Sequence, residues 1–308
     1  MHAALVTAYK DFDMLERLVL RLQSLGMRVF VHIDKRSAGA KEAVVRIRSL
    51  GAEAYSWYSI HWGSRSHLGA LLRLMRSALL DSHVSYIHTL SGQDYPIRSR
   101  DSIESICDGR IFMECEPLHA LPAKARDRFE HYHIRDLADP FFRLPYRADQ
   151  IAVGVQRLLR VRRQRTRSHP SIWKGLVWVS LPAEVARYCC ESAAAKNLWS
   201  ELRCSALPEE FFFQTLLAGS PYVDQIDSDN RRFMDWTPRQ GSRPAVLDLT
   251  DIETLRHTHA LFARKFDSTV SEQLLNAIDR QSDVSTFERG LLLDSTQRHS
   301  ITQQAVSS

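Results

Sequence analysis

The sequence predicts an α/β fold in which a mixed, mostly parallel sheet is flanked by helices. Short apolar strands alternate with amphipathic helices through the first 116 residues, a pattern typical of parallel pairing. Polar residues follow directly after several of these strands. The chain has 308 residues, of which 44% are hydrophobic, and this is enough for a sizeable core.

The elements of the first half are indicated by the spacing of apolar residues. In the first helix Met14, Leu15, Leu18 and Leu22 recur at helical spacing, and Gly26 ends it. We expect strands at 3–8, 28–33, 53–57, 84–90 and 110–116, and helices at 11–26, 40–50 and 66–80.

The second half is less regular. Residues 175–181 read as a strand, and 207–217 start a helix with Pro208 in its first turn. The segment 260–279 ends the globular part. We expect a single catalytic domain over 1–285 and a polar, disordered C-terminal tail over 286–308.

Charge and cysteine content exclude several classes of protein. The net charge of +5 and the pI of about 9.0 favour anionic ligands but fall short of a nucleic-acid-binding signature. The five cysteines form no CxxC pair, so we expect reduced thiols in a cytoplasm. No signal peptide and no apolar run of membrane-spanning length are evident.

Two strand ends carry unusual polar content: "HIDKRS" at 32–37 and "SGQDYP" at 91–96. In α/β sheets ligands bind beyond the carboxyl ends of the strands. We therefore expect both segments to face a ligand crevice.

Suppose that this crevice binds a nucleotide-sugar. The protein must then provide positive charge beside the diphosphate, which is the leaving group. Many enzymes supply it with a metal ion held by an Asp-x-Asp pair, but the strand ends here carry none. The "DSD" at 227–229 lies in a loop-like segment, and we interpret it as surface. Arg264 and Lys265 in "FARKF" are the alternative, because Arg and Lys can hold a diphosphate without a metal.

With these motifs the chain resembles glycosyltransferase family 14, which contains the core-2/I-branching β-1,6-N-acetylglucosaminyltransferases and the peptide O-xylosyltransferases. The resemblance covers about residues 3–280. Its anchors, in the family's order, are "HIDKRS", "HWGSRSHLGALLRL", "LSGQDYPI", "LPEEFFFQTLLAGSPYVDQIDSDNRRFMDW" and "LFARKFDSTVSEQLLNAID". It implies a GT-A-type glycosyltransferase fold, an inverting mechanism and no metal or other cofactor.

The resemblance also implies roles for individual residues. Glu210 matches the catalytic base, with Glu209 as a helix-start residue. The positions implied to bind the UDP-sugar are Asp34, Arg36, Trp62, Gly63, Asp94, Arg243, Arg264 and Lys265. Those implied to bind the acceptor are Glu114, Arg128, Trp178 and Trp236.

Some positions depart from the family. "GLVW" at 175–178 replaces the usual "GSxW", an Asp found in xylosyltransferases is missing at Val177, and Tyr9 replaces a usual His. The altered "GLVW" pocket favours UDP-N-acetylglucosamine as donor and a glycan acceptor in polysaccharide or glycoconjugate synthesis. The missing counterparts of the paired cysteines of secreted animal members imply a bacterial member, which favours the same choice, whereas the wording of the last two anchors favours UDP-xylose. The alternatives are UDP-xylose as donor, a metal-dependent transferase that uses "DSD", and an inactive nucleotide- or glycan-binding protein on the same fold.

The remaining polar features have two readings each. The basic segment 157–167, "RLLRVRRQRTR", is either a solvated face or a contact with an anionic membrane or a lipid-linked glycan acceptor. If the segment contacts a membrane, we expect the cytoplasmic protein to bind peripherally at the inner face of that membrane. We interpret His32 and His88 as hydrogen-bonded core residues, "FFF" at 211–213 as core, and the histidines of "EHYHIRD" as acceptor-side loop or packing.

Overall fold

The structure of the chain is a computed structural model that describes residues 1–134, 146–163 and 166–280. The expected tail at 286–308 and part of the basic segment 157–167 lie outside these residues. The chain divides into two compact units. The first comprises residues 1–92 and 107–231, and the second comprises 93–106 and 232–308. The single domain expected over 1–285 stays a prediction.

The first unit is built on a seven-stranded sheet with the strand order β10-β6-β9-β4-β1-β2-β3. β1 pairs in parallel with β2 and with β4, and β9 runs antiparallel between β4 and β6. This confirms a mixed, mostly parallel sheet. Its strands are β1 (His2–Ala8), β2 (Arg28–Ile33), β3 (Glu53–Tyr55), β4 (Tyr86–Ser91), β6 (Ile111–Phe112), β9 (Ser180–Pro182) and β10 (Ile226–Asp227).

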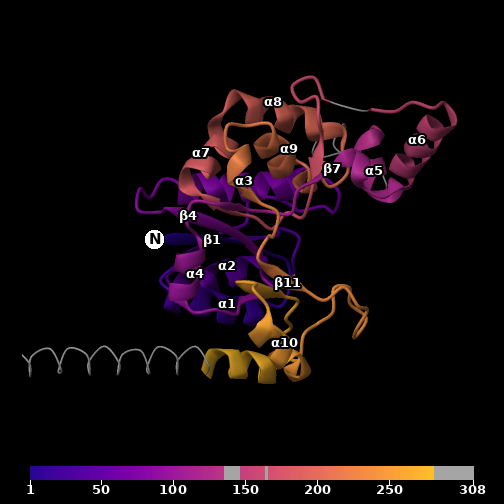
Figure 1. The fold of residues 1–308 in the computed structure, drawn as a ribbon. Coiled ribbons are helices and arrows are strands. Elements are labelled where there is room, and N and C mark those ends of the chain that lie inside the picture. The colour runs from indigo at the N-terminus through magenta and orange to yellow at the C-terminus, as the bar shows by residue number, and fades with distance from the viewer. Residues whose placement is uncertain (135–145, 164–165, 281–308) are drawn as a thin grey trace, which may run out of the picture. The chain divides into compact units, whose positions relative to one another are not determined.

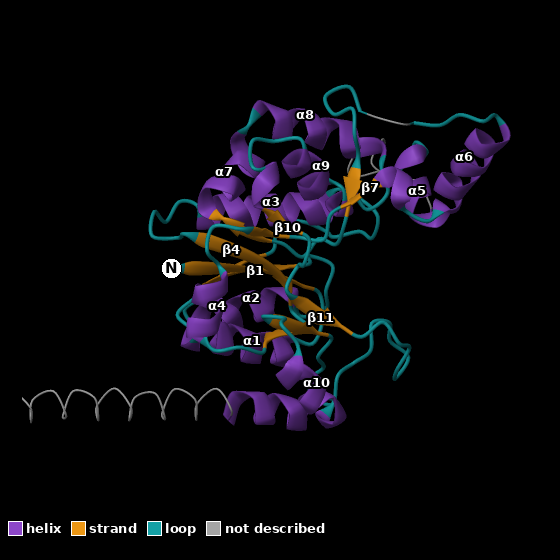
Figure 2. Cartoon of the chain, in the orientation of Figure 1, coloured by secondary structure: helices purple, strands orange, loops and turns teal. Residues whose placement is uncertain are grey.

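Helices cover both faces of this sheet, as Figures 1 and 2 show. One face carries α1 (Phe12–Ser24) and α2 (Ala40–Ser49). The other carries α3 (Ser66–Ala78), α7 (Ala183–Glu191), α8 (Ala193–Glu201) and α9 (Phe212–Ala218). The predicted α/β class is thereby confirmed, and no described helix is long and apolar enough to cross a membrane.

The unit also contains a small sheet of β7 (Glu116–Pro117) and β8 (Trp173–Lys174), which pair antiparallel. Helices α5 (Ala123–Glu130) and α6 (Tyr146–Leu158) follow β7 in the chain. The core of the unit packs side chains of α3, α7 and α9 onto the sheet, and "FFF" at 211–213 is fully buried there as predicted.

The strand predicted at 175–181 is shorter than expected, since only Ser180–Pro182 forms β9. In the residues before β9, the Thr89 side chain takes the place of some strand-to-strand hydrogen bonds. Its Oγ1 accepts from the Val179 N–H and donates to the Val177 carbonyl at 2.9 Å. A side chain that satisfies backbone groups in this way competes with strand pairing. The strand predicted at 110–116 is likewise limited to Ile111–Phe112.

The chain passes from the first unit to the second at Gly92 and Gln93. A Cβ at Gly92 would lie 2.9 Å from Ala8 Cβ, so this close approach requires glycine. The second unit has a three-stranded sheet of β11 (Arg232–Met234), β12 (Phe262–Arg264) and β5 (Asp94–Pro96), with helices α4 (Arg100–Ile106) and α10 (Ile252–His257). The end of "SGQDYP" is therefore a strand.

Candidate functional site

Glu210 ends a short 3₁₀ turn, Pro208–Glu210, that leads into α9. Its Oε2 lies 3.0 Å from Lys174 Nζ and also pairs with the Arg128 guanidinium. Its Oε1 has no partner among the described residues. Because two cations hold Oε2, Oε1 is the carboxylate oxygen that is left for a further contact.

Glu114 belongs to the same cluster as Glu210. Burial raises the pKa of its carboxyl, Lys174 opposes this rise, and the negative charges of Glu116 and Glu210 add to it. The structure thus brings together three of the residues predicted for the catalytic base and the acceptor, namely Glu114, Arg128 and Glu210.

Gly175 joins these two carboxylate-bearing segments. Its N–H donates to the Glu210 carbonyl at 3.0 Å, and a Cβ there would lie 1.8 Å from the Glu114 carbonyl oxygen. No side chain fits in that space. Trp178, also predicted to bind the acceptor, is largely buried and offers little surface to a ligand.

The Trp62–Gly63 segment contacts the turn that carries Glu210. The Leu207 N–H donates to the Gly63 carbonyl at 3.3 Å. Trp62 itself is 71% exposed, which suits a stacking surface for a ring. These two residues, predicted to bind the UDP-sugar, therefore lie close to the predicted base.

Asp34 holds the loop that precedes Trp62. Its Oδ1 accepts from the N–H groups of Arg36, at 3.0 Å, and Ile60, at 2.9 Å. The exposed Arg36 guanidinium donates to the Ile60 carbonyl at 3.1 Å. In this structure both residues order the loop, and Asp34 is largely buried.

Asp94 and Arg264 form a buried pair in the second unit. They face each other across β5 and β12, with Arg264 Nε 3.4 Å from Asp94 Oδ1. The Asp94 side chain is only 1% exposed. The polar chemistry of "SGQDYP" is thus used largely inside the unit, where the Tyr95 hydroxyl also donates to Asp279 at 2.8 Å.

Lys265 directly follows this pair, and its Nζ donates to Ser242 Oγ at 3.3 Å. The contact brings Lys265 to the segment that carries the exposed Arg243. Trp236, a predicted acceptor residue, is 49% exposed and also belongs to this unit. The predicted residues thus form one group in each unit.

The "DSD" segment is ion-paired. Arg231 lies 3.3 Å from a carboxylate oxygen of Asp227 and 3.3 Å from one of Asp229, and Arg110 approaches Asp227. Both carboxylates of this segment are thus paired with arginine side chains.

The core histidines are placed as predicted. His32 Nε2 accepts from the Trp57 and Tyr58 N–H groups, and burial lowers its pKa to about 4. In "EHYHIRD" both histidines are buried, and His133 pairs with the buried Asp149 at 3.0 Å. Packing is therefore the role of both.

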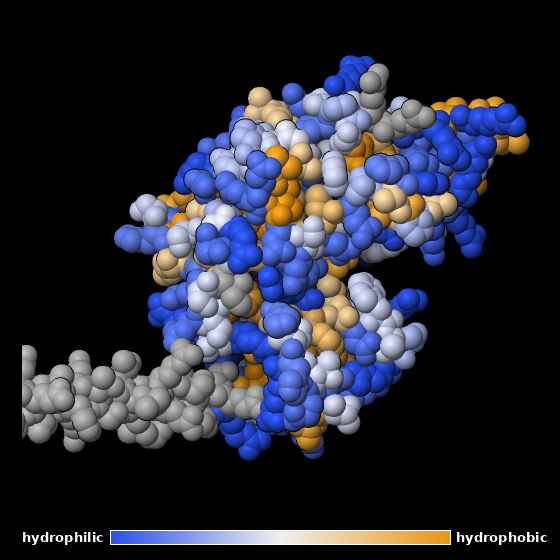
Figure 3. Space-filling model, in the orientation of Figure 1, coloured by the Kyte–Doolittle hydropathy of each residue, from blue (hydrophilic) through white to orange (hydrophobic). Residues whose placement is uncertain are grey.

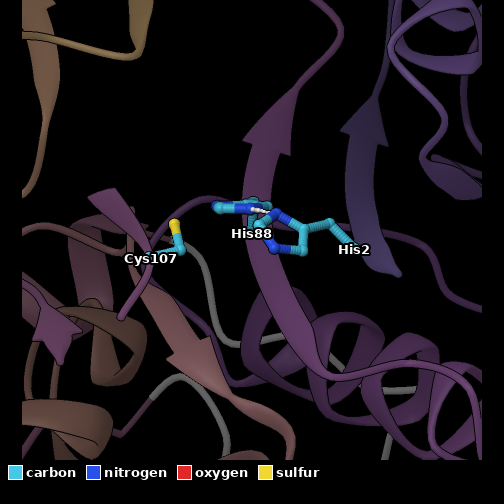
Figure 4. A group of neighbouring side chains, drawn as sticks. All are labelled: His2, His88 and Cys107. Atoms are coloured by element: carbon cyan, nitrogen blue, oxygen red, sulfur yellow. Dashed lines mark hydrogen bonds between the residues drawn. The ribbon is translucent and has the colours of Figure 1, made fainter. Parts of the chain in front are cut away.

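His88, with His2 and Cys107, forms the cluster drawn in Figure 4. His88 donates to or accepts from Ser180 Oγ at 2.8 Å and His2 Nδ1 at 3.1 Å. The ligand atoms of the three residues lie within 4.8 Å of one another, and His2 is the first residue of β1. The hydrogen bonds account for both histidines, and we assign no ion here.

Sequence reasoning missed two residues beside Glu210. Lys174 precedes "GLVW", but a lone lysine carries no signal of its own. His67 lies within the "HWGSRSHLGALLRL" anchor, with Nδ1 3.4 Å from Glu209 Oε1 and Nε2 3.1 Å from Thr7 Oγ1. Glu209 is buried, and its Oε2 has no hydrogen-bond partner among the described residues.

Comparison with known proteins gives a family match over most of the chain. Residues 3–258 match the family described as "Branch: Core-2/I-Branching enzyme". "Xylosyltransferase 1" of Rattus norvegicus is 24% identical over 277 residues, which are 81% of this chain and 31% of that protein. "Xylosyltransferase sqv-6" of Caenorhabditis briggsae is 22% identical over 285 residues, 82% of this chain and 33% of that protein. The chain therefore spans about a third of the length of these curated relatives.

Similarity to solved structures is more distant. "HddC from Yersinia pseudotuberculosis" aligns with a TM-score of 0.29 and 9% identity, over 60% of this chain and 79% of that one. A "4-diphosphocytidyl-2C-methyl-D-erythritolsynthase" from Anaerococcus prevotii aligns with a TM-score of 0.30 and 9% identity, over 62% of this chain and 78% of that one.

Proposed function

Because the chain belongs to the core-2/I-branching enzyme family of glycosyltransferases, we propose that it moves a sugar from a UDP-sugar to a hydroxyl of a glycan acceptor, with inversion and without a metal. We favour N-acetylglucosamine as the sugar and surface polysaccharide or glycoconjugate synthesis as the setting. One observation carries this proposal: Glu210 has one carboxylate oxygen held by Lys174 and Arg128, and the other has no partner within the described parts of the chain.

The proposed reaction follows from that geometry. The acceptor hydroxyl oxygen forms a bond to the anomeric carbon, while the bond from that carbon to the UDP phosphate oxygen breaks. The hydroxyl proton passes to Glu210, and UDP leaves as an anion. We propose that Glu114 and Arg128 bind acceptor hydroxyls beside Glu210, and that the exposed Trp62 stacks on a sugar or base ring.

In the second unit we propose that Lys265 and Arg243 bind the diphosphate. Lys265 Nζ donates to Ser242 Oγ, and a lysine ammonium is a group that binds phosphate oxygens. Asp94 pairs with Arg264 and thereby fixes the strand end that precedes Lys265. This makes Asp94 a positioning residue in our proposal.

UDP-xylose remains a second candidate donor, because the similar curated proteins named above are xylosyltransferases. The residue at Val177 weighs against it, because the family's xylosyltransferases are expected to carry an Asp at this position. Five cysteines outside disulfides and the exposed arginines Arg157, Arg160 and Arg162 support a cytoplasmic location beside the membrane.

The deciding experiment measures UDP release by purified protein with a panel of UDP-sugars in excess EDTA. We expect release that depends on the donor and rises with a glycan acceptor. Release only after addition of manganese would replace the metal-independent mechanism with a metal-dependent one. If no donor supports release and UDP still binds by calorimetry, the chain is an inactive binding protein.

A further inference from the structure

Helix α6 turns an apolar face to solvent. Ile151, Val155, Leu158 and Leu159 follow the spacing i, i+4, i+7 and i+8, which places them on one side of a helix. All four are exposed, and Leu158 reaches 82% exposure. Val161 extends this surface beyond the end of the helix. Figure 3 shows orange surface along α6 next to blue.

The opposite face of α6 is firmly attached to the first unit. The buried Asp149 accepts from the Ile134 N–H at 2.9 Å and pairs with His133 at 3.0 Å. Gln156 bonds both the N–H and the carbonyl of Tyr132, at 2.7 Å and 2.9 Å. Val153 is 3% exposed. These contacts set the orientation of the helix and direct its aliphatic side chains outward.

Arginines lie at both ends of this apolar face. Arg147 in the first turn of α6 and Arg160 just after the helix are exposed and have no acidic partner among the described residues. From residue 150 to residue 167 the sequence contains no Asp or Glu. Exposed aliphatic side chains flanked by arginines are complementary to an anionic lipid bilayer, which has negatively charged headgroups at its surface and apolar acyl chains below them.

We propose that the α6 surface, defined as Arg147, Ile151, Val155, Leu158, Leu159, Arg160 and Val161, docks on an anionic lipid bilayer. The aliphatic side chains enter the boundary between headgroups and acyl chains, and the arginines pair with lipid phosphates. Each arginine near an anionic bilayer adds an electrostatic attraction, which salt weakens. A neutral bilayer lacks that attraction.

This orientation has a consequence for the acceptor. α5 carries Arg128, whose guanidinium pairs with Glu210, and Asp127 of α5 pairs with Arg157 of α6. Docking through α6 would therefore hold the Glu210 cluster near the bilayer, where a lipid-linked glycan is found. The docking itself does not depend on the proposed activity.

Co-sedimentation with vesicles tests the proposal. We expect the purified full chain to sediment with 7:3 phosphatidylcholine–phosphatidylglycerol vesicles and to remain in solution with phosphatidylcholine alone. The double variant Leu158→Gln, Leu159→Gln should reduce the partition coefficient at least tenfold. The matched control is Val45→Gln, Leu80→Gln, which removes two exposed aliphatic side chains elsewhere and should bind like wild type.

A second variant, Arg147→Glu with Arg160→Glu, should also lose binding, and 0.5 M NaCl should weaken the wild type. Circular dichroism checks that each variant is folded, and UDP release in solution should be unchanged. The proposal would be overturned if the wild type did not sediment with anionic vesicles, or if the Leu158→Gln, Leu159→Gln variant sedimented with them as the wild type does. Sedimentation velocity that shows a dimer lost in this variant would assign the surface to a second copy of the chain instead.

Discussion

The two units hold their charged groups in opposite ways. In the first, two cations fix a carboxylate, so that Glu210 is the group presented and Lys174 and Arg128 support it. In the second, Asp94 is buried and supports Arg264, while Lys265 is held by a hydroxyl. The difference teaches that the two units use ion pairs differently: in the first, two cations hold an accessible carboxylate, and in the second, a buried carboxylate holds a cation beside Lys265.

Replacement of the presented carboxylate should have the largest effect. We expect Glu210→Gln to lower turnover by about 10²–10⁴-fold, the usual contribution of a general base, because the amide cannot take the acceptor proton. UDP affinity and the thermal midpoint should change little. Steady-state UDP release and calorimetry measure the two effects, and wild-type turnover would show that another group is the base.

Gly175→Ala should disturb the support of that carboxylate. The new methyl group would lie 1.8 Å from the Glu114 carbonyl oxygen, so the backbone must move. We expect a loss of about 3 kcal/mol in the free energy of unfolding, measured with urea.

Gly154→Ala in α6 is the matched control for Gly175→Ala. A methyl group there meets nothing within 4 Å. It should stabilise the protein by about 0.5–1 kcal/mol, since alanine is the better helix former. If both substitutions change the free energy of unfolding by the same amount, the close approach at Gly175 does not limit the stability of the protein.

Removal of the positive charge in the second unit should act on donor affinity rather than on chemistry. We expect Lys265→Ala to raise the dissociation constant of UDP by about 10–100-fold, as for a lost charge-assisted hydrogen bond. Lys265→Arg should retain most of the affinity, and Arg256→Ala, at an exposed arginine of the same unit, should retain all of it. Equal UDP affinity in wild type and Lys265→Ala would reject the role of this cation.

The smallest effect concerns His32, which lies in the first unit outside the Glu210 cluster. Its pKa is about 4 in the folded protein and about 6.5 when unfolded, so the unfolded state binds more protons between these values. Stability should therefore fall as the pH drops below 6.5, by about 2 kcal/mol from pH 7 to pH 5.

His32→Gln isolates this contribution, because the amide oxygen can accept from the same Trp57 and Tyr58 N–H groups. Urea unfolding at pH 7 and pH 5 should show that the wild type loses about 2 kcal/mol more than the variant. Parallel losses in both proteins would mean that His32 binds a proton equally in the folded and unfolded states.

Much of the fold follows from local patterns. The strand 28–33 and the first helices lie where apolar spacing places them, because burial against one sheet imposes that spacing. The segment 175–179 could not be predicted, because it depends on the Thr89 side chain, distant in sequence. Asp94 illustrates the same limit: its sequence context marks it as special, but only the register of β5 with β12 shows that it faces Arg264.

Within the candidate site, the sequence identified Glu210, Glu114 and Arg128 through motif resemblance, and it missed Lys174 and His67. Both missed residues contact side chains far along the chain: Lys174 contacts Glu210, and His67 contacts Glu209 and Thr7. Contacts between residues so far apart in the sequence produce no regular spacing of residue types from which they could be predicted. The close approach at Gly175 is likewise visible only in three dimensions.

The segment 175–179 also suggests how the specificity of the protein could be redesigned. Its backbone is held at successive points: the Gly175 N–H by Glu210, the Leu176 carbonyl by Gln214 at 2.8 Å, and the Val177 carbonyl by Thr89. The half-buried side chain at 176, and that at 177 within the volume of the buried valine, can therefore be varied while the main chain beside the proposed acceptor residues keeps its path. A library at these two positions, with Gly175 unchanged, is a compact route to new acceptor preferences.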